Sequence, residues 1–167
     1  MSAAGPPQGA RPLGGDHACA IFDVVIAGAG LPGLALAPAL ARTGLRVTLV
    51  DRAPIAAAMP VDDAFDPRVY AISPGSAAFL ARIGAWQTLP IERLQAIESM
   101  RIEGDDGGLL QFSAYDLGER ALAWIVEERA LRAALIPALH AAGVDVRGST
   151  AFESLSWSAD EIGRAHV

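Results

Sequence analysis

The chain has no lysine and a single cysteine, and each shortage excludes a class of protein. Its 13 basic residues are all arginine, and 19 acidic residues outnumber them. The resulting net charge of −6 argues against a protein that binds nucleic acid or an anionic membrane surface. The lone cysteine, Cys19, cannot form an internal disulfide and has no companions for binding a metal, which favours a reducing cytoplasm.

We expect neither a secretory leader nor a membrane span. Residues 1–20 are rich in Gly, Pro and Ala without a basic start and an apolar run, so we expect a disordered tail. The stretch from Val24 to Ala41 is uncharged and about as long as a span. Because it contains three glycines and two prolines, we expect it to divide into a buried strand and a buried helix.

What the sequence does have is the composition of a globular protein and a β-α-β pattern at its start. Of its 167 residues 52% are hydrophobic and 19% are charged, enough for one core. Residues 22–28 are an apolar run rich in Val and Ile, typical of a strand covered on both faces. A helix at 31–43 and a second buried strand at 45–51 follow. This unit predicts parallel strands with a right-handed connection, and so an α/β fold.

The rest of the chain predicts a mixture of helices and antiparallel strands. Alternating apolar and polar residues indicate the strands, and apolar residues four apart indicate the helices. Such a mixture after a parallel start predicts two interleaved sheets, one for a cofactor and one leaning over it. The expected segments are a loop at 52–71, a helix capped by Ser73 and ending near Gly84, a half-buried hairpin at 99–103 and 109–112, a strand at 122–126, a helix at 127–142 and a strand at 144–147.

A glycine motif stands between the first expected strand and helix. The letters GAGLPG, residues 28–33, fit G-x-G-x-x-G, and Asp51 ends the next strand 23 positions after the first glycine. In this pattern Gly28 permits a tight turn, Gly30 leaves the backbone open to a pyrophosphate, and Gly33 lets the helix pack closely on the strand. The context is the one that a dinucleotide-binding turn requires.

The residues around the motif support a phosphate site. The amides of Leu31 and its neighbours, with the positive end of the helix, would attract phosphate groups. Pro32 gives up an amide that would be unpaired in any case. Asp51 can accept hydrogen bonds from ribose hydroxyls and disfavours a 2′-phosphate. FAD and NAD share this half of the site, so the residues alone leave the choice of dinucleotide open.

Longer stretches resemble a known family. The sequence FDVVIAGAGLPGLALAPALARTGLRVTLVDR resembles the opening of the FAD-dependent aromatic-ring hydroxylases. More narrowly, DPRVYAISPGSAAFLARIGAW, PIERLQAIESMRIEGDDGG and AWIVEERALRAAL resemble the ubiquinone-biosynthesis hydroxylase branch. The resemblance implies a Rossmann-like, p-hydroxybenzoate-hydroxylase-like FAD-binding domain with the start of an interleaved antiparallel substrate sheet. Since members of the family are much longer, it also implies that residues 21–160 are the N-terminal part of the domain, a truncated form.

The resemblance implies an activity and a set of binding residues. Such enzymes bind FAD, take electrons from NADH or NADPH, and use oxygen to hydroxylate the ring of a polyprenylated phenol. The flavin carries the chemistry, so neither a catalytic side chain nor a metal site is implied. The implied cofactor-binding residues are Gly28, Gly30, Leu31, Pro32, Gly33, Asp51, Arg52 and Arg68.

Two positions need comment. Arg68 follows the first long loop and in such proteins reaches the phosphate or ribityl region of the flavin. Its residue type alone would equally allow a salt bridge to Asp62, Asp63 or Asp66. Glu128 departs from the branch, which more often has a neutral amide or imidazole there, so the resemblance does not support a flavin contact for this residue.

Several alternatives and partners follow from the same analysis. The chain could belong to an FAD hydroxylase of another aromatic metabolite, or to a non-catalytic FAD-binding subunit of a quinone-synthesis assembly. An NAD-dependent dehydrogenase is disfavoured because no catalytic His-acid or Tyr-Lys arrangement is present. Expected partners are the aromatic substrate, oxygen and other quinone-biosynthesis proteins, in the cytoplasm or peripherally at the inner membrane. Residues 161–167, EIGRAHV, match the translation of a common sequencing-adapter read, and we predict a non-native tail there.

Overall fold

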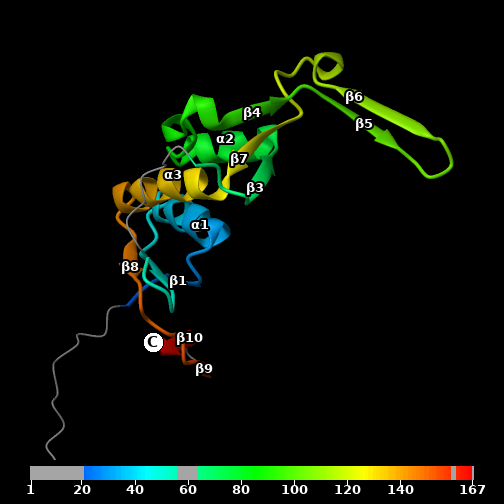
Figure 1. The fold of residues 1–167 in the computed structure, drawn as a ribbon. Coiled ribbons are helices and arrows are strands. Elements are labelled where there is room, and N and C mark those ends of the chain that lie inside the picture. Colours follow the sequence, from blue (N-terminus) through cyan, green and yellow to red (C-terminus); the bar gives the residue numbers. More distant parts are fainter. Residues whose placement is uncertain (1–20, 56–63, 159–160, 167) are drawn as a thin grey trace, which may run out of the picture.

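The β-α-β unit forms as the sequence predicts. The computed structural model describes residues 21–55, 64–158 and 161–166, and Figure 1 shows their arrangement. The first sheet consists of three parallel strands in the order β1-β2-β8. β2 is fully buried, as a strand covered on both faces should be. The elements are β1 (Val24–Ala27), α1 (Leu31–Ala41), β2 (Val47–Val50) and β8 (Asp145–Arg147).

The uncharged stretch between Val24 and Ala41 divides into β1 and α1, as expected. α1 has 11 residues, too few to cross a bilayer. No helix among the described residues is both long enough and apolar enough for a membrane span.

A second, antiparallel sheet has the order β3-β7-β4. The sequence predicted only its central strand, and the loop expected at 52–71 is wrong at its end, where β3 forms. The side chains of β3 are mostly exposed, so the strand is stabilised by its ladder with β7 and carries no burial pattern that the sequence could reveal. β4 was missed as well. The strands are β3 (Val69–Ile72), β4 (Leu94–Ile97) and β7 (Ala123–Glu127).

The core lies between the two sheets, where α1 packs against α3. The Ser73 side chain caps α2 by accepting the Ser76 N–H at 3.2 Å, as predicted. Leu34, Leu49, Leu135 and Leu139 are fully buried. The helices are α2 (Pro74–Arg82) and α3 (Glu128–Ala141), with short 3-10 turns η1 (Trp86–Thr88), η2 (Ile91–Arg93) and η3 (Tyr115–Leu117).

The predicted hairpin forms, but its expected half-burial is wrong. β5 (Ser99–Glu103) and β6 (Leu109–Ser113) project away from the rest of the described chain in Figure 1. Met100, Ile102 and Phe112 are all exposed, because among the described elements only η3, the next along the chain, makes more than slight contact with this ribbon. A second antiparallel pair joins β9 (Ser154–Ser158) and β10 (Glu161–His166). The non-native origin of residues 161–167 stays a prediction, and residues 1–20 lie outside the described chain.

Candidate functional site

The glycine motif forms a tight turn between β1 and α1. Gly28 has a φ of +110°, a backbone conformation that residues with a side chain rarely adopt. Its N–H donates to the Val50 carbonyl of β2 at 2.8 Å. A Cβ on Gly33 would collide with the Gly28 carbonyl oxygen and would lie 3.5 Å from the Ile26 side chain. Both glycines therefore have the steric role that the sequence predicted for them.

Gly30 faces open space at the N-terminus of α1. It is the N-cap of the helix, and an added Cβ would meet only the Pro32 ring, at 3.8 Å. Among the described residues no side chain caps this helix, and its first turn contains no acidic residue. The first backbone hydrogen bond of the helix joins the Leu34 N–H to the Gly30 carbonyl at 2.9 Å. The amide of Leu31, which precedes this bond, therefore points out of the helix end. A bare turn beside uncapped amides fits a diphosphate.

Asp51 follows β2 and points at the turn. Its Oδ2 accepts the Ala29 N–H at 2.6 Å, and its Oδ1 accepts the Ala53 N–H at 2.7 Å. The Ala29 bond, then the Ala53 bond, and the nearby guanidinium groups of Arg132 and Arg52 hold the pKa of the Asp51 carboxyl below its usual value. A carboxylate can accept about four hydrogen bonds, so the two amides leave capacity for ribose hydroxyls. Contact with a ribose stays a prediction, as does any role for the exposed Arg52.

Arg132 is a site residue that the sequence analysis missed. It lies on α3, and its Nη1 donates to the Ala29 carbonyl of the glycine turn at 2.9 Å. The contact exists because α3 packs against α1, a pairing between segments 103 residues apart. No local pattern marks this arginine, so only the tertiary fold reveals that it braces the turn.

Arg68 pairs with Glu128, a partner that the sequence analysis did not consider for it. Its Nη1 lies 3.5 Å from Glu128 Oε2, to which the Tyr70 hydroxyl also donates at 3.4 Å. Asp66 instead accepts the backbone N–H of Arg68 at 3.0 Å. Asp62 and Asp63 lie outside the described residues. The Arg68 side chain is 75% exposed and remains accessible to a ligand.

One face of α3 connects these groups. Glu128 and Arg132 are four residues apart and therefore adjacent on that face. Arg132 touches the glycine turn, while Glu128 holds Arg68 about one helical turn, or roughly 5.4 Å, nearer the start of α3. Arg132 and the Glu128–Arg68 pair therefore lie along the same face of α3.

Comparison with known proteins identifies a matching family model and several curated relatives. A family model described as FAD binding domain matches residues 22–162. Among curated relatives, ubiquinone biosynthesis monooxygenase COQ6 of Mus musculus is 30% identical over 82% of this chain and 29% of its own length. Ubiquinone hydroxylase UbiL of Rhodospirillum rubrum is 34% identical over 83% of this chain and 32% of its own. The corresponding values for 3-demethoxyubiquinol 3-hydroxylase of Escherichia coli are 31%, 71% and 30%. The chain thus spans at most about a third of each of these relatives.

Solved structures share the fold. The p-nitrophenol 4-monooxygenase PnpA of Pseudomonas putida superposes with a TM-score of 0.61 at 21% identity, over 84% of this chain and 34% of its own. CtdE, whose structure is a complex with FAD, gives 0.57 at 17% identity, over 86% and 34%. At such identities the likeness concerns the fold alone.

Proposed function

Because this chain belongs to the FAD binding domain family, we propose that it supplies the dinucleotide-binding part of an FAD-dependent monooxygenase. The whole enzyme hydroxylates the ring of a polyprenylated phenol in ubiquinone biosynthesis. The support for this substrate class is that the relatives from mouse, Rhodospirillum rubrum and Escherichia coli are named as ubiquinone-pathway monooxygenases or hydroxylases.

The observation that carries the proposal is the open turn at Gly30. It combines a backbone without side-chain cover, an uncapped helix end and a carboxylate at the end of the neighbouring strand. In our proposal the amides at 30–33 bind the diphosphate, and Asp51 binds the adenosine ribose. Arg132 keeps the turn in place, while Arg68 reaches the ribityl chain of the flavin, beyond the diphosphate.

The protein would contribute binding and orientation, and the cofactor the reaction. Bound FAD would take electrons from NADH or NADPH and use them to activate oxygen for hydroxylation. The residues of this chain would hold the two ends of the cofactor apart, with adenosine at Asp51 and flavin toward Arg68. The enzyme would act in the cytoplasm or peripherally at the inner membrane. The membrane location would follow from the prenylated substrate, which partitions into lipid.

FAD titration of the chain tests the proposal. We expect the unaltered chain to bind FAD, and Asp51→Ala and Gly30→Val each to weaken binding more than tenfold. For Asp51 the reason is that a lost charge-assisted bond is worth about 1.5–3 kcal/mol; for Gly30 it is that a valine side chain would fill the space through which a diphosphate reaches the backbone. Gly108→Val is the matched control, since a Cβ at Gly108 also meets only open space but lies in the hairpin turn. Full FAD loading of both site variants would overturn the assignment.

A further inference from the structure

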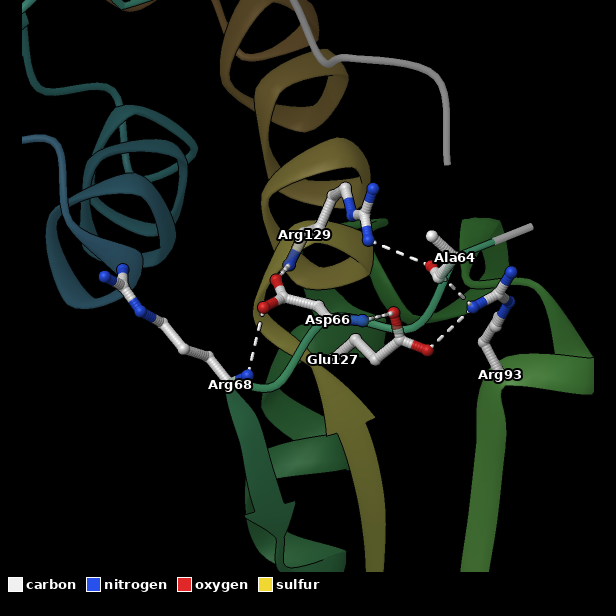
Figure 2. Close-up of polar contacts among 6 residues, drawn as sticks. All are labelled: Ala64, Asp66, Arg68, Arg93, Glu127 and Arg129. Carbon is white, nitrogen blue, oxygen red and sulfur yellow. Dashed lines mark hydrogen bonds and ion pairs between the residues drawn. The ribbon is translucent and has the colours of Figure 1, made fainter. Parts of the chain in front are cut away.

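The segment that carries Arg68 is held by a cluster of charged groups away from the glycine turn. Figure 2 shows Glu127, Asp66, Arg93 and Arg129 around the backbone of residues 64–68. Glu127 ends β7, and its side chain is almost fully buried, with the residue only 5% exposed. Buried carboxylates are rare unless paired, so this one calls for an explanation.

Both oxygens of Glu127 are used. Oε2 accepts the backbone N–H of Asp66 at 3.0 Å, and Oε1 accepts Nη1 of Arg93 at 2.9 Å. The Arg93 and Glu127 side chains are 11% and 6% exposed, whereas those of the Arg101–Glu103 pair in the hairpin are 65% and 68% exposed. The Glu127 contacts are therefore shielded from water, which makes them stronger than the hairpin pair.

Asp66, whose backbone is bound by Glu127, in turn binds the backbone of Arg68. Its Oδ1 accepts the Arg68 N–H at 3.0 Å, and its Oδ2 accepts the backbone N–H of Arg129 at 3.2 Å. The Arg68 carbonyl in turn accepts the Glu128 N–H at 2.9 Å. The backbone of Arg68 is thus fixed at both its donor and its acceptor.

The start of the segment is fixed as well. The Ala64 carbonyl accepts Nη2 of Arg129 at 2.9 Å and Nη1 of Arg93 at 3.4 Å. Of the six residues drawn in Figure 2, Arg68 is the one whose side chain extends away from Asp66 and Glu127. A rigid backbone with an exposed cationic side chain is the arrangement expected of a ligand-binding arginine.

We propose that Glu127 is a positioning residue for flavin binding, which through Asp66 and Arg93 fixes residues 64–68 so that Arg68 stands on the α3 face leading from the glycine turn. The inference rests on the proposed function. It adds that binding of the flavin half depends on a buried carboxylate that touches neither cofactor nor substrate. The adenosine half, held by the turn and Asp51, is independent of it.

Glu127→Gln separates the two halves. The side chain keeps its size, but its amide nitrogen must face either the Asp66 N–H or the Arg93 guanidinium, both of which are donors. FAD and ADP are titrated into the chain by calorimetry, since ADP lacks the flavin half. We expect Glu127→Gln to raise the Kd for FAD about tenfold and to leave the Kd for ADP within about twofold, because the change acts only through Arg68.

A double-variant cycle identifies the route. Arg68→Met should lose FAD affinity to a similar degree, and Glu127→Gln added to Arg68→Met should cost little more, because both act through one contact. Glu103→Gln is the matched control, the same change in an exposed ion pair, and should alter neither Kd. If Glu127→Gln does not fold, Asp66→Asn carries the same expectation, since Asp66 is not fully buried.

The outcomes are distinct. Unchanged FAD affinity in a folded Glu127→Gln, or equal loss of FAD and ADP affinity, would overturn the inference and leave the proposed function standing. Absence of FAD binding by the unaltered chain would overturn the proposed function, and the inference with it.

Discussion

The Arg132 guanidinium donates a hydrogen bond to the carbonyl oxygen of Ala29, across 103 residues of sequence. The same turn receives a carboxylate on its other side, where Asp51 accepts the Ala29 N–H. The peptide groups of Ala29 are thus bound from α3 and from the end of β2 at once. The turn is fixed before any ligand arrives, which reduces the ordering cost of binding.

This brace can be tested by Arg132→Met, which keeps the length of the side chain and removes its donors. Loss of a charge-assisted hydrogen bond should weaken binding of both ADP and FAD by roughly tenfold, because each needs the turn. Calorimetric titration of the two ligands measures this. A loss confined to FAD would show that Arg132 acts on the flavin half and does not brace the turn.

Gly33→Ala should destabilise the fold itself. Its Cβ would collide with the Gly28 carbonyl oxygen, so helix and turn must separate, at about 2 kcal/mol or more of unfolding free energy. Gly75→Ala is the matched control near the start of α2, where the nearest atom to an added Cβ is 4.0 Å away. That variant should be neutral or up to about 1 kcal/mol more stable. Urea unfolding of both variants decides, and equal stabilities would contradict this account of Gly33.

Acid should weaken the fold through its hydrogen-bonded carboxylates. Backbone N–H donors are the largest cause of a lowered pKa at Asp51, Asp66 and Glu127. A pKa that is lower in the folded state than in the unfolded state gives stability that is complete above the unfolded value and is lost as the pH falls through the folded value. With ordinary values of 3.8 and 4.5, this loss should occur below about pH 4.5.

Asp51→Asn isolates one of these contributions. The variant should be less stable than the unaltered chain at pH 7. The difference should shrink as the pH falls below about 4, because the Asp51 carboxyl then takes up a proton more readily in the unfolded chain than in the folded one. Unfolding curves at pH values from 7 to 3 measure the difference. A difference that stays constant over this range would contradict the role of the Asp51 charge.

The exposed hairpin predicts a contrast in mutational cost. Ile102→Thr on β5 should change the unfolding free energy of this chain by no more than about 0.5 kcal/mol, because the side chain already faces water. Leu135→Ala in the buried face of α3 should cost about 2–5 kcal/mol. Chemical denaturation of both variants gives the comparison. A large cost for Ile102→Thr would indicate that something covers the ribbon in solution.

Local patterns predicted the part of the fold that depends on burial. The buried, largely apolar run of β2 and the glycine motif placed the β-α-β unit, and the positive φ of Gly28 follows from its place in that motif. β3 could not be found in this way, because its exposed residues are ordered by pairing with β7, some 55 positions later. The hairpin strands have a burial pattern in sequence that no neighbour in the described chain satisfies.

The candidate site also has a part that local sequence predicted and a part that only the tertiary fold reveals. The glycine turn and Asp51 are close in sequence and were predicted together. Arg132 and Glu127 were not, because each acts on a segment more than sixty positions away. Glu127 did leave a signal, an acid directly after the apolar run Trp-Ile-Val, but its partner Arg93 lies on a different element.

The parallel pairing of β2 with β8 has a consequence for synthesis of the protein. Thr48 and Asp145 face each other in that ladder, and the Thr48 hydroxyl lies 3.0 Å from Asp145 Oδ2. A ribosome must therefore translate nearly a hundred codons after β2 before its second neighbour exists. Until then one buried strand has an open edge in the nascent chain, an aggregation hazard that chaperones could cover.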